Sequence, residues 1–335
     1  MKTILLPLVL AFAGAASAAP ASVDELNKMA GRFAPVELTA DASLLTPGDR
    51  KAIAKLIEAA RIVDVLQLRQ RWEGNEALWA ALRKDATPLG KARLDYFWLN
   101  KGPWSILDGN VSFLPAQVAG IAVPEKKPEG ANFYPSGAGK AAVEAWINGL
   151  PAQDKQQAQW FFTTIRTGAD GKFKIVKYSD EYRPELEKLA ALLREAAAAT
   201  GNASLKKFLT LRADAFLSND YLPSDLAWMD LDSPVDVTIG PYETYNDELF
   251  GYKAAFEAYV SIRDQKETEK LNFFAQHMQE LEDNLPLDPK YRNPKVGAPA
   301  PYTWFTTTMG ASAPTFGLRY FGSSGRLSSL SLIHI

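Results

Sequence analysis

The 335-residue chain contains no cysteine. Disulfide bridges, thiolate metal sites and cysteine nucleophiles are therefore excluded, and the packing of apolar side chains has to stabilise the fold. A chain of this length can form one large domain or two ordinary ones, because single cores stop growing beyond roughly 250–300 residues. Hydrophobic residues make up 47% of the sequence and charged residues 23%, which is the composition of a globular protein.

Charge and histidine content narrow the possible functions. The formal net charge is −2 and the isoelectric point is near 5.9, so the sequence gives no electrostatic reason to expect nucleic acid or an anionic membrane as a partner. The sequence has two histidines, His277 and His334. A histidine-rich metal site or a Ser-His-Asp triad would have to use one or both of them.

The first twenty residues have the pattern of a secretory signal peptide. Lys2 precedes an apolar stretch over residues 4–16, and Ala16, Ser17 and Ala18 form an A-x-A cleavage site. The stretch is shorter than the ~20 apolar residues of a membrane span, and no other run approaches that length. We therefore predict a signal peptide over residues 1–18, cleaved near Ala18, and export to the bacterial periplasm or medium. A buried N-terminal helix is the alternative.

The last thirteen residues, SSGRLSSLSLIHI, have neither a helix cap nor a charged finish. Residues 330–335 are also what one reading frame of a common sequencing adapter would encode. We expect residues 323–335 to be non-native and the natural protein to continue, in which case His334 is not biological. A genuine stop codon after Ile335 in uninterrupted genomic DNA would contradict this expectation.

Helical spacing of apolar residues dominates the chain from residue 46 onwards. Thr46 is a predicted N-cap, a proline occupies the first helical position, and apolar residues continue at helical spacing to Leu68. Similar patterns predict further helices, with Ser179 as the cap of one and Asn246 or Asp247 as the cap of another. The further helices are expected at residues 76–84, 89–100, 140–149, 153–166, 179–200, 205–218, 246–262 and 267–284.

Extended structure is expected in three places. Residues 118–123, among several prolines, fit a strand or a loop, and residues 173–178 fit a strand. Val235, Val237 and Ile239 alternate with polar residues and glycine, which is the period of a half-buried strand. The predicted fold class is therefore α+β, predominantly helical with a small β-sheet or barrel component.

The predicted strand at residues 235–239 leads into a segment crowded with tyrosines and acids. Glu243 and Tyr245 are two positions apart, so their side chains point to the same side if the backbone is extended. A carboxylate beside a phenol can bind a cation and donate a hydrogen bond to an oxygen, as the amino end of a peptide and its carbonyl require. The alternative is a structural corner, in which acids offset the positive end of a helix and tyrosines fill the space beneath.

Two weaker motifs suggest a ligand site, but a structural role explains each of them better. Residues 137–140 (GAGK) lack the first glycine and the Ser or Thr of a phosphate-binding loop, so we interpret them as a turn before a helix. Four aspartates could suggest calcium, but their spacing does not match an EF-hand loop. We interpret Asp225, Asp230, Asp232 and Asp236 as caps and turn formers.

Several segments resemble the dipeptidyl peptidase III family of zinc metallopeptidases, in particular its exported bacterial members. The most specific part is Glu243-Thr244-Tyr245 within its surroundings, and the resemblance covers most of residues 30–322. The segments that carry it are residues 132–135 (NFYP), 170–171 (DG), 219–221 (NDY), 227–230 (AWMD), 239–245 (IGPYETY) and 250–257 (FGYKAAFE).

The resemblance implies a two-lobed metallopeptidase that removes dipeptides from the free N-termini of short peptides. Glu243 would hold the substrate ammonium, and Tyr245 would help to stabilise the tetrahedral transition state. The family's zinc is held by a His-Glu-x-x-Gly-His helix and a later glutamate, and this sequence contains neither the motif nor its equivalent. His277 lacks a second histidine at the required spacing, so we interpret it as a surface or packing residue and predict no metal ligand in the chain.

We therefore expect residues 19–322 to be the N-terminal portion of an exported zinc exopeptidase, an incomplete two-lobed metallopeptidase. Zinc would be bound in the full-length parent, and this chain by itself would be inactive. The alternative is a noncatalytic exported peptide-binding or scaffold protein, complete as written. Short peptides with a free N-terminus are the expected partners, and no sequence feature indicates an oligomeric state.

Overall fold

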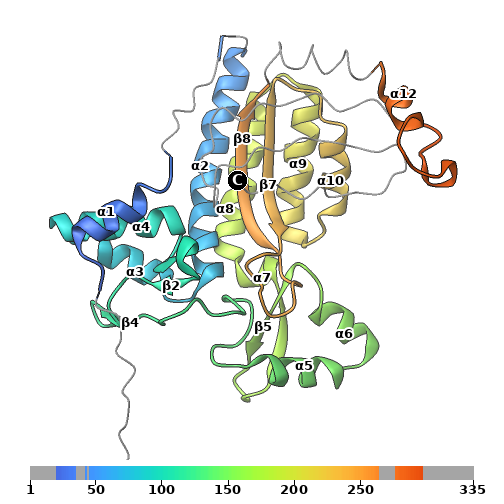
Figure 1. Cartoon of the computed structure of the whole chain (residues 1–335). Helices are drawn as coiled ribbons and strands as arrows, with labels where there is room; N and C mark the ends of the chain where they lie inside the picture. Colours follow the sequence, from blue (N-terminus) through green and yellow to red (C-terminus); the bar gives the residue numbers. More distant parts are fainter. Residues whose placement is uncertain (1–19, 35–41, 44, 264–275, 297–335) are drawn as a thin grey trace, which may run out of the picture.

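The computed structural model describes residues 20–34, 42–43, 45–263 and 276–296 (Figure 1). Helices predominate, and the strands form small antiparallel sheets of two strands each, none of which closes into a barrel within these ranges. The predicted α+β class is confirmed. The helices are α1 (Val23–Ala30), α2 (Pro47–Arg71), α3 (Asn75–Leu82), α4 (Pro88–Asn100), α5 (Lys140–Asn148), α6 (Ala152–Ala158), α7 (Tyr178–Glu181), α8 (Arg183–Ala199), α9 (Ala203–Ser218), α10 (Leu222–Met229) and α12 (Met278–Asp283), with short 3₁₀ turns at Ile106–Asp108 and Pro289–Tyr291.

The strands pair in chain order, each with its nearest neighbour in the sequence. The pairs are β1 (Trp104–Ser105) with β2 (Val111–Ser112), β3 (Gln117–Val118) with β4 (Ile121–Ala122), β5 (Thr163–Thr167) with β6 (Phe173–Lys177), and β7 (Val235–Glu243) with β8 (Ala255–Ile262). The strands predicted at residues 173–178 and 235–239 are therefore confirmed as β6 and β7.

The start of α2 follows the local chemistry that the sequence predicts. The Thr46 hydroxyl accepts a hydrogen bond from the Asp49 amide (3.1 Å), and the Asp49 carboxylate accepts one from the Thr46 amide (3.4 Å). This reciprocal capping satisfies two amides that have no partner inside the helix. The buried Asp49 carboxylate also accepts a hydrogen bond from the Thr200 hydroxyl (2.7 Å), which ties the beginning of α2 to the end of α8.

Two hydrophobic clusters meet along α2. The larger one joins α2 with α8, α9 and the β7–β8 hairpin, and the smaller one joins α2 with α1, α3 and α4. Figure 1 shows the helices of the smaller cluster on one side of α2 and the β7–β8 hairpin on the other. Leu66 lies in the larger cluster and Leu68 in the smaller one, both fully buried. The helix α2 thus packs both against the helices of the smaller cluster and against the β7–β8 hairpin that carries Glu243.

The helix predicted over residues 246–262 is wrong. Residues 255–262 form β8, which pairs with β7 from Val235 opposite Ile262 to Glu243 opposite Ala255. The misreading has a simple cause: apolar residues four apart lie on one face of a helix and also on one face of a strand, because four is a multiple of two. Residues 256, 258 and 260 all face the larger core, whereas in a helix residue 258 would turn away from the other two.

Two other boundaries differ from the sequence prediction. The helix expected over residues 153–166 ends at Ala158, and residues 163–167 form β5 because threonines and isoleucine there favour a strand. Ser179 lies inside α7 rather than capping a helix, and α8 begins separately at Arg183. Pro184 lies in the first turn of α8, where its missing amide costs nothing.

No helix in the described ranges is long and apolar enough to cross a membrane. Of the predicted charged helix over residues 267–284, residues 267–275 lie outside the described part of the chain, and the remainder contains α12. The predicted signal peptide and the predicted non-native tail also lie outside the described residues, so both stay predictions.

Candidate functional site

The candidate site lies where β7 ends. The strand runs to Glu243, the pairing shifts between Pro241 and Glu243, and Tyr245 and Asn246 form a turn. Glu243 is half-buried, and the Tyr245 side chain is 58% exposed. Because the extended backbone ends before Tyr245, strand alternation does not by itself bring the carboxylate and the phenol together. Their joint role remains a prediction.

Asp247 organises the turn that follows. Its side chain is buried and accepts five hydrogen bonds: one from the Tyr134 hydroxyl (2.7 Å) and four from backbone amides. One carboxylate oxygen accepts from Leu249 and Phe250, and the other accepts from Tyr134, Tyr252 and Lys253. A single carboxylate thus replaces the backbone pairing that a helix would have provided. This explains why residues 247–253 form a compact loop instead of the predicted helix.

Lys253 closes the same loop from its far end. Its buried amine donates to the carbonyl oxygens of Ala158 (2.6 Å) and Trp160 (2.9 Å) and to the Thr163 hydroxyl (2.8 Å). Burial lowers the pKa of Lys253 to about 7, although the charge of Asp247 opposes the shift. The lysine connects the loop to the turn between α6 and β5, so both ends of the 247–253 loop are fixed.

A buried arginine packs against the end of β7, just before Glu243. The Arg212 side chain is fully buried, forms an ion pair with Asp225 and lies over the rings of Tyr221 and Tyr242, 5.3 Å from each centroid. Gly240 is required beneath it: its φ is +151°, and a Cβ there would lie 2.7 Å from Arg212 Nη1. Asp225 therefore has a structural role, but as the ion-pair partner of Arg212 within α10 and not as the predicted cap or turn former.

A second acid lies near Glu243 on the neighbouring strand. Glu257 lies opposite Gly240 in the β7–β8 pairing and is buried. Burial, and to a lesser extent the negative charge of Glu243, raise the pKa of Glu257 to about 8, although a hydrogen bond from Tyr259 opposes the shift. Glu257 is therefore largely protonated at neutral pH, so it does not add a second negative charge next to Glu243.

The described residues do not fit a zinc site. No group of three or more His, Cys, Asp or Glu side chains within them could share a metal ion. His277 precedes α12 at the surface, and its ring nitrogen lies 3.4 Å from the Glu280 carboxylate. It is a surface residue, as predicted, and the four aspartates weighed for calcium do not converge either.

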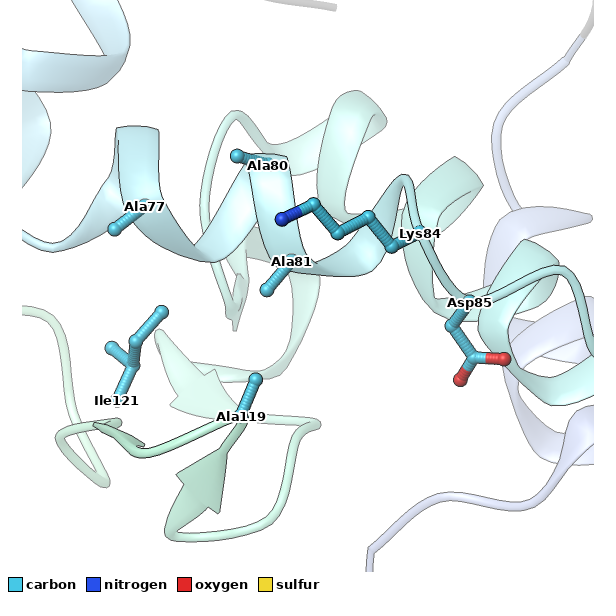
Figure 2. Close-up of a pocket in the computed structure, with 7 residues that line it drawn as sticks. All are labelled: Ala77, Ala80, Ala81, Lys84, Asp85, Ala119 and Ile121. Atoms are coloured by element: carbon cyan, nitrogen blue, oxygen red, sulfur yellow. The ribbon is translucent and has the colours of Figure 1, made fainter.

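A shallow groove of about 470 Å³ lies away from the candidate site, between α3 and the β3–β4 hairpin (Figure 2). Three alanines of α3 line it together with Ala119 and Ile121, and Lys84 and Asp85 stand at one end. None of the residues around the 243–245 segment lines this groove. Its mostly apolar, open surface offers no convergent polar groups of the kind that fix a ligand.

Comparison with known proteins identifies relatives over most of the chain. The model of peptidase family M49 matches residues 147–311. The structure of dipeptidyl-peptidase III from Corallococcus sp. strain EGB is 52% identical, with a TM-score of 0.77, over 85% of this chain and 52% of that chain. DPP III from Caldithrix abyssi is 41% identical, with a TM-score of 0.74, over 83% of this chain and 51% of that chain.

A plant protein is similar as well: Nudix hydrolase 3 of Arabidopsis thaliana is 39% identical over 315 residues, which is 82% of this chain and 41% of that protein. The chain therefore spans about half the length of the solved relatives and less of the plant protein. Fold and similarity together place the chain in a family of peptidases. The chain belongs to the dipeptidyl peptidase III family, peptidase family M49.

The sequence predicts Glu243 and Tyr245 as candidate residues, but it does not predict the buried residues that hold the segment around them. Glu243 and Tyr245 were singled out by their residue types and by the resemblance. The sequence predicts Asp247 only as a possible helix cap, and it predicts no role in the site for Arg212 or Glu257. A buried charge has no local signature, because the partner that satisfies it lies far away in the sequence.

Proposed function

We propose that this chain supplies the subsite that binds the amino end of a peptide in an exported dipeptidyl peptidase. Glu243 accepts hydrogen bonds from the substrate ammonium, and the Tyr245 hydroxyl donates to the oxygen of the carbonyl that reacts. The observation that carries the proposal is the placement of an exposed Tyr245 and a half-buried Glu243 at a strand end. The loop that follows them is fixed by Asp247 and Lys253.

The electrostatics of the described residues support this assignment. A carboxylate binds an ammonium group through charge-assisted hydrogen bonds, which are about twice as strong as neutral ones. Glu257 stays protonated beside Glu243 and so leaves one anionic partner for one cation. A phenol hydroxyl near the reacting carbonyl can stabilise a developing oxyanion.

Family membership implies a zinc ion, and the proposal assigns no ligand for it among the described residues. In the resembling family, zinc polarises the reacting carbonyl and activates water. We further propose that a longer parent protein carries the zinc site and that the N-terminal residues direct export, as the sequence predicts.

The proposal is tested by peptide binding to the purified chain. The probe is a tetra-alanine peptide with a fluorophore at its carboxyl end, compared with the same peptide acetylated at its amino end. We expect the free peptide to bind more tightly, and Glu243→Gln to weaken it ten- to a hundredfold, which corresponds to ~1.5–3 kcal/mol for a charge-assisted contact. Equal binding of both peptides to the unmodified chain would contradict the proposal.

The second candidate is a noncatalytic peptide-binding protein, and experiments on this preparation do not separate it from the first. Both candidates predict binding, and both predict no turnover of a dipeptidyl-naphthylamide by this chain with added zinc. They differ in the parent gene, where the peptidase predicts a His-Glu-x-x-Gly-His segment further along. A longer DNA read across residue 335 that contained no such segment would favour the binding protein.

A further inference from the structure

Two buried cations hold the residue that follows Tyr245. Arg71 Nη1 donates to the side-chain oxygen of Asn246 (3.3 Å), and Lys127 Nζ donates to its main-chain oxygen (3.3 Å). Both cations are only 7% exposed. They lie 175 and 119 positions away from Asn246 in the sequence, so two distant parts of the chain meet at this one turn.

The burial of these two cations close together lowers the stability of the fold. Burial lowers the pKa of Arg71 to about 10 and also lowers that of Lys127, which the charge of Arg71 lowers further. Glu248, whose carboxylate lies 3.1 Å from Lys127 Nζ, is the acid that opposes both shifts. Glu248 acts on both cations and Asp247 on Lys127 alone, while Asn246 offers each cation a neutral oxygen. Buried like charges destabilise a fold, and proteins retain such local conflicts mainly at functional sites.

Both cations are anchored in the framework that carries the β7–β8 hairpin. Arg71 is the last residue of α2, and the side chain of Gln70 beside it accepts the Phe256 amide at the start of β8 (2.7 Å). Close to Lys127 in the chain, the carbonyl of Glu129 accepts the Glu248 amide (2.8 Å). The contacts to Asn246 therefore connect the turn to α2 and to the segment around residue 127, independently of the Asp247 hydrogen bonds.

We infer that Arg71 and Lys127 are positioning residues for the proposed amino-end subsite: through Asn246 they fix the 243–245 segment, so that Glu243 and Tyr245 present one geometry to a peptide. This inference rests on the proposed function, because it assigns these cations a role in that subsite. The two cations themselves touch the turn and not the peptide. Loss of the contact would let the turn adopt several conformations, and the peptide would then have to order it on binding.

The test uses the ratio of affinities for the free and the acetylated tetra-alanine peptide. Asn246→Ala removes the oxygen that Arg71 contacts, and we expect it to lower the ratio about tenfold, a size typical of coupling between contacting residues. Asn246→Asp keeps an oxygen in place and adds a negative charge between two cations, so it should retain the unmodified ratio. In the Glu243→Gln background, Asn246→Ala should have no further effect on the ratio.

Stability is measured on every variant, since the substitution could also destabilise the fold. Lys101→Met is the matched control: Lys101 is a neighbouring buried cation whose amine pairs with Asp64 (3.0 Å), so its loss should lower stability and leave the ratio intact. If Asn246→Ala does not fold, Arg71→Met takes its place. If folded Asn246→Ala or folded Arg71→Met keeps the affinity ratio of the unmodified chain, the inference is wrong and the proposed function stands. If the unmodified chain does not prefer the free peptide, both the proposed function and the inference are wrong.

Discussion

Replacement of the buried Asp247 carboxylate by an amide should destabilise the whole chain. Asp247→Asn changes one atom, and an asparagine can place its single oxygen on only one side. If the oxygen takes the position that accepts from Leu249 and Phe250, the amide nitrogen faces Tyr134, Tyr252 and Lys253. The amides of Tyr252 and Lys253 then lose their acceptor, and the Tyr134 hydroxyl has to accept instead of donate. If the amide is flipped, two hydrogen bonds are lost.

The expected loss is therefore at least two hydrogen bonds to a charged acceptor, in a place where water cannot replace them. Such bonds contribute about 1.5–3 kcal/mol each, so the free energy of unfolding should fall by about 3 kcal/mol or more. Denaturation followed by tryptophan fluorescence measures this, and the thermal midpoint should fall by roughly 6–12 °C if it shifts by 2–4 °C per kcal/mol.

The control is Asp214→Asn. Asp214 pairs with Arg194 at 2.7 Å, and its side chain is 57% exposed, so its loss should cost less than about 1 kcal/mol. Equal stability of the two variants would refute the view that the Asp247 carboxylate organises the turn. A destabilised Asp247→Asn that still prefers free peptides would confine the role of Asp247 to stability.

Two further substitutions test other parts of the site. The pKa of Glu257 is about 8 in the folded chain, against an ordinary 4.5. Between these pH values the folded chain keeps a proton that the unfolded chain loses. The free energy of unfolding should therefore fall as pH rises from about 4.5 to 8, by up to about 5 kcal/mol. Glu257→Gln should flatten that dependence in urea titrations at several pH values, and an unchanged slope would contradict it. Gly240→Ala should lower the free energy of unfolding by about 1–3 kcal/mol, because a Cβ would lie 2.7 Å from Arg212 Nη1 and the φ of +151° disfavours alanine. Unchanged stability would show that the Arg212 side chain and the backbone at residue 240 can move to accommodate the methyl group.

The helices show what short-range sequence determines. Thr46 and its neighbours specify the start of α2 because capping bonds join residues three apart. α4 and α9 begin within two residues of their predicted starts and end where expected, at Asn100 and Ser218. The sequence also predicts Glu243 and Tyr245 as site residues, because the residue types beside a predicted strand carry a recognisable chemistry and a family pattern; their roles stay a prediction.

Tertiary structure decided what the sequence left ambiguous. Residues 255–262 fit a helix and a strand equally well by spacing, and only the partner β7 selects the strand. The contacts that fix the candidate site join Asn246 to Arg71 and Lys127, and Asp247 to Tyr134, over more than a hundred positions. Local patterns specify local hydrogen bonds, whereas a buried charge is stable only where the fold brings a distant partner to it, and that partner is not visible in the residues around it.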